Sequence, residues 1–244
     1  MEAASSEDAP STFLGTLLGL FASPSKAMQG IAKAPSVWLP LLGLIALNLA
    51  FTAVWVNKMD PRDFMRAQID ETPRLAKLPA EQQQAVIEAQ SKILRPIAWV
   101  GAVLGSPIVV SIVALFVVFV FRFVLGDDTT LRQGFAIIAW SYLTTALVQL
   151  PLILLILTLK ADWNIPPQEV FQAGPAIFLD KQSTSKALFA FLGCLDLFSL
   201  WNIALMAWGF AAAAKRRFGS AVMAVAAPWV VYVAGKVVLA WINS

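Results

Sequence analysis

Two ionisable residues inside apolar stretches are the first candidates for chemistry in this chain. Asp196 lies within Leu192–Phe210, and Lys236 lies within the last apolar stretch. A charge at membrane depth is costly unless it is paired, hydrated or protonated. If the two stretches form antiparallel spans, Asp196 lies roughly 13 Å and Lys236 roughly 9 Å below their outer ends, at a rise of about 1.5 Å per residue. The flexible lysine side chain covers the difference, so the sequence predicts a buried Asp196–Lys236 ion pair.

Three further polar residues fall at a similar depth in other apolar stretches. The same rise per residue places Asn48, Ser106 and Gln149 roughly 12 to 15 Å from the outer ends of their spans. The sequence therefore predicts an intramembrane polar layer in the outer half of a helical bundle, formed by Asn48, Ser106, Gln149, Asp196 and Lys236.

This polar layer has a structural and a functional interpretation. In the first, the charges pair and fix helix register, while amides and hydroxyls join neighbouring helices. In the second, the layer is a proton- or ion-linked pathway in which Asp196 changes charge and Lys236 tunes it. We prefer the structural interpretation because no second acid and no histidine relay accompanies the pair.

The remaining residue types argue against catalysis. The chain has no histidine, which is the commonest general base and metal ligand, so we expect no catalytic residue, no cofactor and no metal site. Its single cysteine, Cys194, lies in an apolar stretch and is expected to pack as an inert thiol. The 18 basic and 15 acidic residues give a net charge of +3, which is too balanced for a nucleic-acid-binding protein.

The elements that must position these residues are membrane-spanning helices. Of the 244 residues, 59% are hydrophobic and 14% are charged, whereas soluble domains carry about 25% charged residues. We therefore expect an all-α integral membrane protein with a five-transmembrane-helix bundle in residues 37–244. Five stretches reach the roughly 20 residues that a spanning helix needs: Val37–Val56, Ile97–Leu125, Gly134–Leu159, Ala187–Ala213 and Ala221–Ile242.

Two short segments precede the first span. Residues 1–11 are small, polar and acidic, and are expected to form a disordered tail. Residues 12–36 are expected to form two short amphipathic helices that lie in the membrane interface. In the second of them, Ser23 is the expected N-cap and Pro24 the first helical residue.

Two of the four connections between spans are long. Lys58–Pro96 is expected to be folded, because Asp60 and Pro61 form a cap and a first helical position and Pro79 opens a further helix. Ala161–Lys186 contains three prolines, so we expect it to be extended with little helix.

The distribution of basic residues gives opposing indications of orientation. The face with the N-terminal region carries seven basic residues, and the face with the two long connections carries ten. Charge counting is strongest for short loops and weakens for segments that fold. We therefore rely on the compact basic turn formed by Lys215, Arg216 and Arg217, and place it in the cytoplasm. The N-terminus is then cytoplasmic and the C-terminus lies outside.

Several local motifs resemble those of bacterial Yip1-domain proteins. Their order and spacing cover most of the chain from Leu14 onward. These motifs are Phe21–Lys26 with Ser23 and Pro24, Trp38–Leu42, Leu131–Ala136, and Asp196-Leu197-Phe198-Ser199-Leu200-Trp201.

The resemblance implies a five-span bundle in the bacterial inner membrane with a cytoplasmic N-terminus, and it supplies no catalytic residues. Eukaryotic relatives act in vesicle trafficking with prenylated small GTPases, a role that is not carried over to this chain. Some bacterial relatives are associated with export transporters. We therefore expect a non-enzymatic scaffold or accessory protein in the lipid bilayer, with an export complex or a second copy as its partner. The alternative is a small proton- or ion-linked transporter that uses Asp196 and Lys236.

Overall fold

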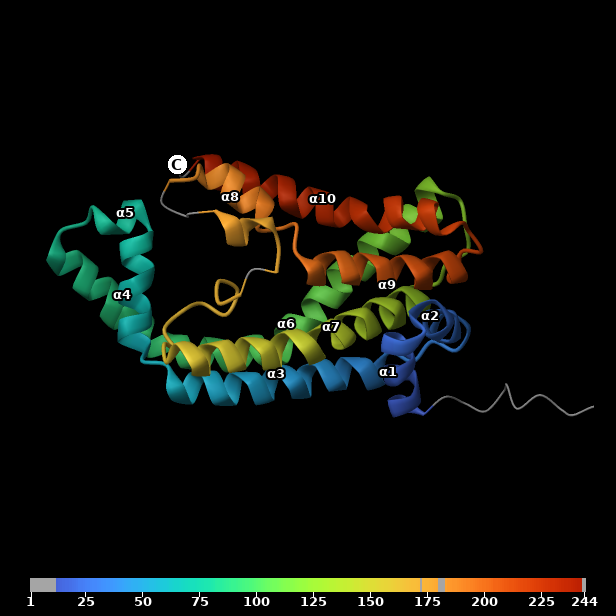
Figure 1. Cartoon of the computed structure of the whole chain (residues 1–244), viewed down its shortest axis with the longest axis horizontal. Coiled ribbons are helices and arrows are strands. Elements are labelled where there is room, and N and C mark those ends of the chain that lie inside the picture. Colours follow the sequence, from blue (N-terminus) through green and yellow to red (C-terminus); the bar gives the residue numbers. More distant parts are fainter. Residues whose placement is uncertain (1–11, 172, 180–182, 243–244) are drawn as a thin grey trace, which may run out of the picture.

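A computed structural model describes residues 12–171, 173–179 and 183–242, and the expected tail of residues 1–11 lies outside them. All regular elements in this part of the chain are helices. Four helices are long and apolar enough to cross a membrane, or up to five crossings if the bent pair α8 and α9 is one span. This confirms the predicted all-α membrane fold (Figure 1).

Three of the predicted spans match single helices to within three residues. These are α3 (Trp38–Lys58), α7 (Leu131–Lys160) and α10 (Phe218–Ile242). Thr130 begins α7 through a capping box in which its hydroxyl accepts from the backbone N–H of Gln133 and the Gln133 side chain accepts from the backbone N–H of Thr130.

The predicted second span is part of a much longer helix. Helix α6 (Ala80–Phe119) continues into the π-helical turn η1 (Val120–Val124), giving 45 residues in all. At 1.5 Å per residue that is roughly 68 Å, about twice the thickness of the hydrocarbon core. The helix expected after Pro79 and the span expected from Ile97 are therefore one element. Pro96 lies inside α6 and does not end it. The residues before Pro96 are good helix formers, and the proline removes only its own backbone N–H from the helical hydrogen bonds.

The predicted fourth span is broken. Helix α8 (Lys186–Leu192) and helix α9 (Leu197–Ala213) meet at an angle of 47°, with residues 193–196 between them. The sequence predicted one span from Ala187 to Ala213. The bent pair covers these bounds, but its helix is interrupted at residues 193–196. Asp196, expected in the middle of a helix, stands instead at the start of α9.

The two N-terminal helices are α1 (Phe13–Ala22) and α2 (Pro24–Lys33). Pro24 is the first residue of α2, as predicted, but the Ser23 side chain makes no capping hydrogen bond. Helix α2 packs against α9 and α7, with Met28 fully buried. The outer face of α1 leaves large apolar side chains exposed. That these helices lie in the membrane interface stays a prediction.

The first long connection is folded. Asp60 caps α4 (Pro61–Glu71) by accepting from the backbone N–H groups of Arg62 at 2.8 Å and Asp63 at 3.0 Å, as the sequence predicted. Helix α4, the short α5 (Pro73–Ala76) and the first turns of α6 extend beyond the ends of α3 and α7 (Figure 1). We call this group of helices the α4–α6 unit.

The second long connection contains little helix, as predicted. Its described residues hold one 3-10 turn, η2 (Pro175–Phe178), before α8 begins. Two hydrogen bonds attach it to the end of α3: the Trp55 indole donates to the Trp163 carbonyl at 3.2 Å, and the Asp60 N–H donates to the Asn164 side chain at 3.0 Å.

Candidate functional site

A cavity of about 760 Å³ lies between the helices in the half of the bundle nearer the long connections. Its walls come from α3, α6, α7, α10, the break between α8 and α9, and the second long connection, which contributes Gln168, Glu169, Phe171 and Ala173. The structure brings all five residues of the predicted polar layer to this cavity: Asn48, Ser106, Gln149, Asp196 and Lys236.

Two hydrogen bonds between side chains join helices across the cavity walls. The Asn48 amide donates to the Ser106 hydroxyl at 3.0 Å and links α3 to α6. The Thr145 hydroxyl donates to the Asn202 side-chain oxygen at 2.9 Å and links α7 to α9. This is the role that amides and hydroxyls play between membrane helices. The second link was missed by the sequence reasoning, although Thr145 lies one helical turn before Gln149 on the same helix.

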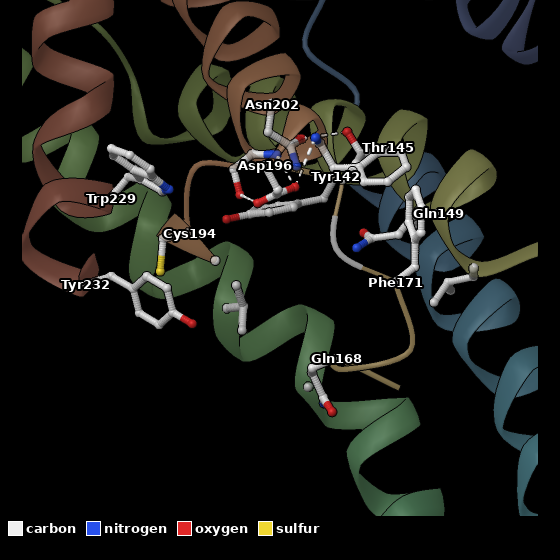
Figure 2. Close-up of a pocket in the computed structure, with 18 of the residues that line it drawn as sticks. Tyr142, Thr145, Gln149, Gln168, Phe171, Cys194, Asp196, Asn202, Trp229 and Tyr232 are labelled. Carbon is white, nitrogen blue, oxygen red and sulfur yellow. Dashed lines mark hydrogen bonds between the residues drawn. The ribbon is translucent and has the colours of Figure 1, made fainter. Parts of the chain in front are cut away.

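The amide of Gln149 is available for binding. It lines the cavity from α7 and makes no hydrogen bond to any residue that the structure describes. Figure 2 shows Gln149 on the same wall as Thr145, with Phe171 of the second long connection beside it. A partly buried amide with free donors and a free acceptor can bind a polar group that enters the cavity.

Asp196 does not form the predicted ion pair with Lys236. One carboxylate oxygen accepts from the backbone N–H groups of Phe198 and Ser199, both at 3.0 Å, and the other accepts from the Ser199 hydroxyl. Lys236 is exposed on α10, and its ammonium group lies 5.8 Å from the centre of the Tyr232 ring. No ion pair links the two charges, which are both in the described part of the chain.

The break before α9 is the physical reason for this difference. The first N–H groups of a helix have no partner within the helix, and the helix N-terminus carries a partial positive charge. Because α9 begins at Leu197, Asp196 meets these groups and needs no basic side chain. The sequence did contain a signal for this, since aspartate before an apolar helical segment is a common N-cap.

The second long connection contacts the backbone at the break between α8 and α9. The Leu197 N–H donates to the Ala173 carbonyl at 3.1 Å, so the second long connection bonds directly to the start of α9. The backbone of the next residue, Gly174, lies so close to the Leu195 carbonyl that a Cβ there would overlap with it. Gly174 has φ −149°, so it is required here for space rather than for a left-handed backbone.

The described residues contain no group of three or more His, Cys, Asp or Glu side chains that could hold a metal ion. Cys194 lines the cavity and is buried. Figure 2 shows Asp196 beside Tyr142 and Asn202, with Trp229 and Tyr232 of α10 on another wall.

The family-like motif residues fall into two separate places. Ser23 and Pro24 begin α2, which lies near the turn between α9 and α10 (Figure 1). Asp196, Leu197 and Phe198 begin α9 at the cavity. Trp201, on α9, makes an edge-to-face contact with Trp208 at 6.2 Å and packs against the apolar core.

The basic turn connects two loops at one end of the bundle. Arg216 forms an ion pair with Asp127 at 3.3 Å and donates to the Leu125 carbonyl. Lys215 adopts a left-handed backbone conformation with φ 52°. Arg216 therefore has a structural partner in addition to the topological role that the sequence assigned to Lys215, Arg216 and Arg217.

The fold and the positions of these motifs agree with the comparison with known families. The sequence profile of the Yip1 domain matches residues 18–240. No curated protein and no solved structure matches the chain significantly. The profile covers the helices from α2 to α10, including the walls of the cavity and both long connections. The chain therefore belongs to the Yip1-domain family of membrane proteins.

Proposed function

We propose that this protein is a non-enzymatic scaffold or accessory protein of the bacterial inner membrane, which assists a membrane complex or organises the membrane around it. The observation that carries the proposal is the α4–α6 unit, a folded extramembrane element built on the same helix as the second span. In the proposed orientation the N-terminus is cytoplasmic, and this unit and the C-terminus lie outside.

The α4–α6 unit is suited to contact a partner because it is packed rather than flexible. Phe64, Met65 and Ile69 of α4 pack with Ile87 of α6 in an apolar cluster, and all four side chains are at least nine-tenths buried. The same cluster includes residues at the end of α3. A contact made on this unit is therefore fixed relative to the membrane bundle.

The transporter alternative loses its particular support. It depended on an ion pair between Asp196 and Lys236 in a proton pathway, and Asp196 instead caps α9. No ion pair of the described residues replaces the one on which that alternative depended.

Site-specific photocrosslinking in native membranes tests the scaffold proposal. A photoreactive residue at Gln84 or Glu88 reports on one exposed face of the α4–α6 unit, because these residues are one turn apart on α6 and share a 3.1 Å hydrogen bond. A matched control at Met223, which is exposed on α10, reports on a lipid-facing position.

We expect Gln84 and Glu88 to give the same protein adduct and Met223 to give none. Co-expression of a second copy of this protein with a different tag identifies the partner. An adduct that carries both tags is a homo-oligomer, and an adduct with one tag contains a different protein such as a component of an export complex. If all three positions consistently give only the uncrosslinked monomer, the scaffold role is wrong.

A further inference from the structure

The cavity holds opposite charges that do not neutralise each other. Lys236 and Asp196 both line it, but the Asp196 carboxylate is bonded to the start of α9 and the Lys236 ammonium contacts only the Tyr232 ring among the described residues. A lysine at membrane depth is stabilised by an anionic partner. The cavity therefore offers a positive site and a negative site to a single ligand.

The cavity opens on the surface between α6 and α10. Gly101 of α6 and Lys236 of α10 are both exposed and both line the cavity. A Cβ at Gly101 or Gly105 would meet no atom within 4 Å, so no side chain closes this edge. The surface around the opening is apolar, and only 17% of the most apolar window of α10 is buried inside the protein. The apolar surface beside Lys236 is the part of the opening that would meet lipid if α10 crosses a bilayer.

We propose that the cavity binds the head group of a zwitterionic phospholipid that carries a primary amine. Lys236 pairs with the lipid phosphate at the opening, and Asp196 accepts a hydrogen bond from the lipid ammonium further inside. The neutral amide of Gln149 bonds the polar backbone of the head group. The acyl chains lie outside, against exposed apolar residues of α10 such as Val231 and Val238.

The volume of the cavity and the chemistry of its lining fit this ligand class. The volume of about 760 Å³ falls within the range of small-molecule sites, roughly 300 to 1,000 Å³. The carboxylate of Asp196 keeps acceptor capacity beyond its three hydrogen bonds, because a carboxylate has about four acceptor sites. A zwitterionic head group can contact both Lys236 and Asp196, whereas a purely anionic one matches only Lys236. The proposal does not depend on the scaffold role or on any protein partner.

Lipid binding to the purified full chain tests the proposal. The protein is delipidated in detergent and titrated with phosphatidylethanolamine or with phosphatidylglycerol of the same acyl chains, and bound lipid is counted by native mass spectrometry. We expect phosphatidylethanolamine to bind about tenfold more tightly, because only it supplies an ammonium group for Asp196. Equal binding, or preference for phosphatidylglycerol, overturns the proposal.

Two charge variants assign the two ends of the head group. Asp196→Asn keeps a good N-cap residue and should weaken only phosphatidylethanolamine binding, by about tenfold. Lys236→Gln should weaken binding of both lipids to a similar extent. Lys160→Gln, at the end of α7 and outside the cavity, is the matched control and should change neither. Binding that is unaffected by both cavity variants contradicts the assignment.

A steric variant provides a test that keeps every charge. Gly105→Phe places a ring at the cavity edge where the structure has open space, and it should weaken the binding of both lipids. Gly219→Phe has equally open space but lies at the start of α10 and outside the cavity lining, so it should have no effect. Equal effects of the two variants, or none, overturn the proposed position of the lipid.

The soluble head group distinguishes a lipid from a free phosphodiester. Glycerophosphoethanolamine has the same charges without acyl chains and should not displace the bound lipid at equal concentration. Displacement at equal concentration would show that the acyl chains contribute nothing, and it would overturn the lipid as the ligand.

Discussion

At the scale of single residues, the carboxylate of Asp196 is satisfied by the helix that it begins. Its three hydrogen bonds all go to residues within three positions in the sequence. The charge is compensated by N–H groups and by the helix dipole, so no basic side chain is needed. The cap replaces the ion pair with Lys236 that was expected from depth alone, so the two arrangements predict different effects of mutating Asp196.

Replacing Asp196 separates these two interpretations. Asp196→Ala removes the acceptor for the N–H groups of Phe198 and Ser199, and it should lower the free energy of unfolding by about 0.5–2 kcal/mol. Asp196→Asn should cost less, because asparagine is an equally good N-cap. The measurement is reversible unfolding of the full chain in mixed detergent micelles.

The control for this prediction is the double variant. If the two residues do not touch, the effects of Asp196→Ala and Lys236→Ala should add to within about 0.5 kcal/mol. A coupling free energy well above that value would mean that the two charges interact, contrary to the hydrogen bonds described above.

A second prediction at this scale concerns Asp60, which caps α4 outside the membrane. Hydrogen bonds from the backbone N–H groups of Asp63 and then Arg62 lower the pKa of its carboxyl below the ordinary value of 3.8. The folded state therefore favours the charged form. The stabilisation is fully present above pH 3.8 and is lost as the pH falls below that value through the lowered pKa.

Hydrogen exchange at the start of α4 measures this effect. The amides of Arg62 and Asp63 should lose protection in acid, after correction for the intrinsic exchange rate at each pH. In Asp60→Asn the cap has no carboxyl group to titrate, so the corrected protection should stay flat over the same range. An identical pH dependence in both proteins would show that another group controls the opening of α4.

At the scale of elements, the break between α8 and α9 depends on a segment about twenty residues earlier in the chain. The Ala173 carbonyl accepts from the Leu197 N–H, and Gly174 allows the two backbones to approach. Residues 187–213 are mostly apolar, so their composition predicts a single span. The N-cap at Asp196 and the tertiary contact together account for the interruption.

Gly174→Ala should disturb this contact. The added Cβ would overlap with the Leu195 carbonyl and lie 3.2 Å from the Asp196 Cα, and backbone atoms cannot move aside as a flexible side chain can. We expect a loss of about 1–3 kcal/mol in the free energy of unfolding and faster hydrogen exchange at Leu197.

Gly219→Ala is the matched control for Gly174→Ala. A Cβ at Gly219 meets nothing within 4 Å, and alanine favours the helix by up to about 1 kcal/mol, so this variant should be neutral or stabilising. If Gly174→Ala is equally neutral, the close backbone approach does not hold the break.

The difference between local signals and tertiary contacts explains which elements could be predicted from the sequence. Asp60 and Pro61 give a local capping signal, and the cap of α4 was predicted correctly. Apolar length located three spans to within three residues, because a bilayer imposes one thickness on every crossing. Apolar length could not locate the start of α6. The residues before the apolar stretch are good helix formers, so the helix includes them without any local stop signal. Counting depth along each span selected five polar residues that all line the cavity, but it did not specify their hydrogen-bond partners, which depend on packing.

At the scale of the whole molecule, the two ends of the bundle are built differently. One end is compact: Gln133 donates to the Ala32 carbonyl at 3.0 Å, and Arg216 contacts Asp127 and the Leu125 carbonyl. The other end carries the α4–α6 unit and the second long connection (Figure 1). A basic residue in a short turn orients a membrane protein more strongly than one in a folded segment. This is the physical argument for a cytoplasmic compact end.

Accessibility of single cysteines tests that orientation in the native membrane. In a Cys194→Ser background, cysteine replaces Glu88 on the exposed surface of α6 or Asp128 in the exposed loop before α7. An impermeant maleimide should label Glu88→Cys from outside, and it should label Asp128→Cys only after the membrane is opened. A protease-accessible tag fused after Ser244 should be cleaved from outside, because five crossings place the two termini on opposite sides.

Each alternative topology gives a different labelling result. Reversed labelling of Glu88→Cys and Asp128→Cys means that the ten basic residues of the long connections, rather than the Lys215–Arg217 turn, set the orientation. Correct labelling with a protected C-terminal tag would contradict the direction of α10, because the Arg216–Asp127 ion pair places the start of α10 at the same end of the bundle as Asp128.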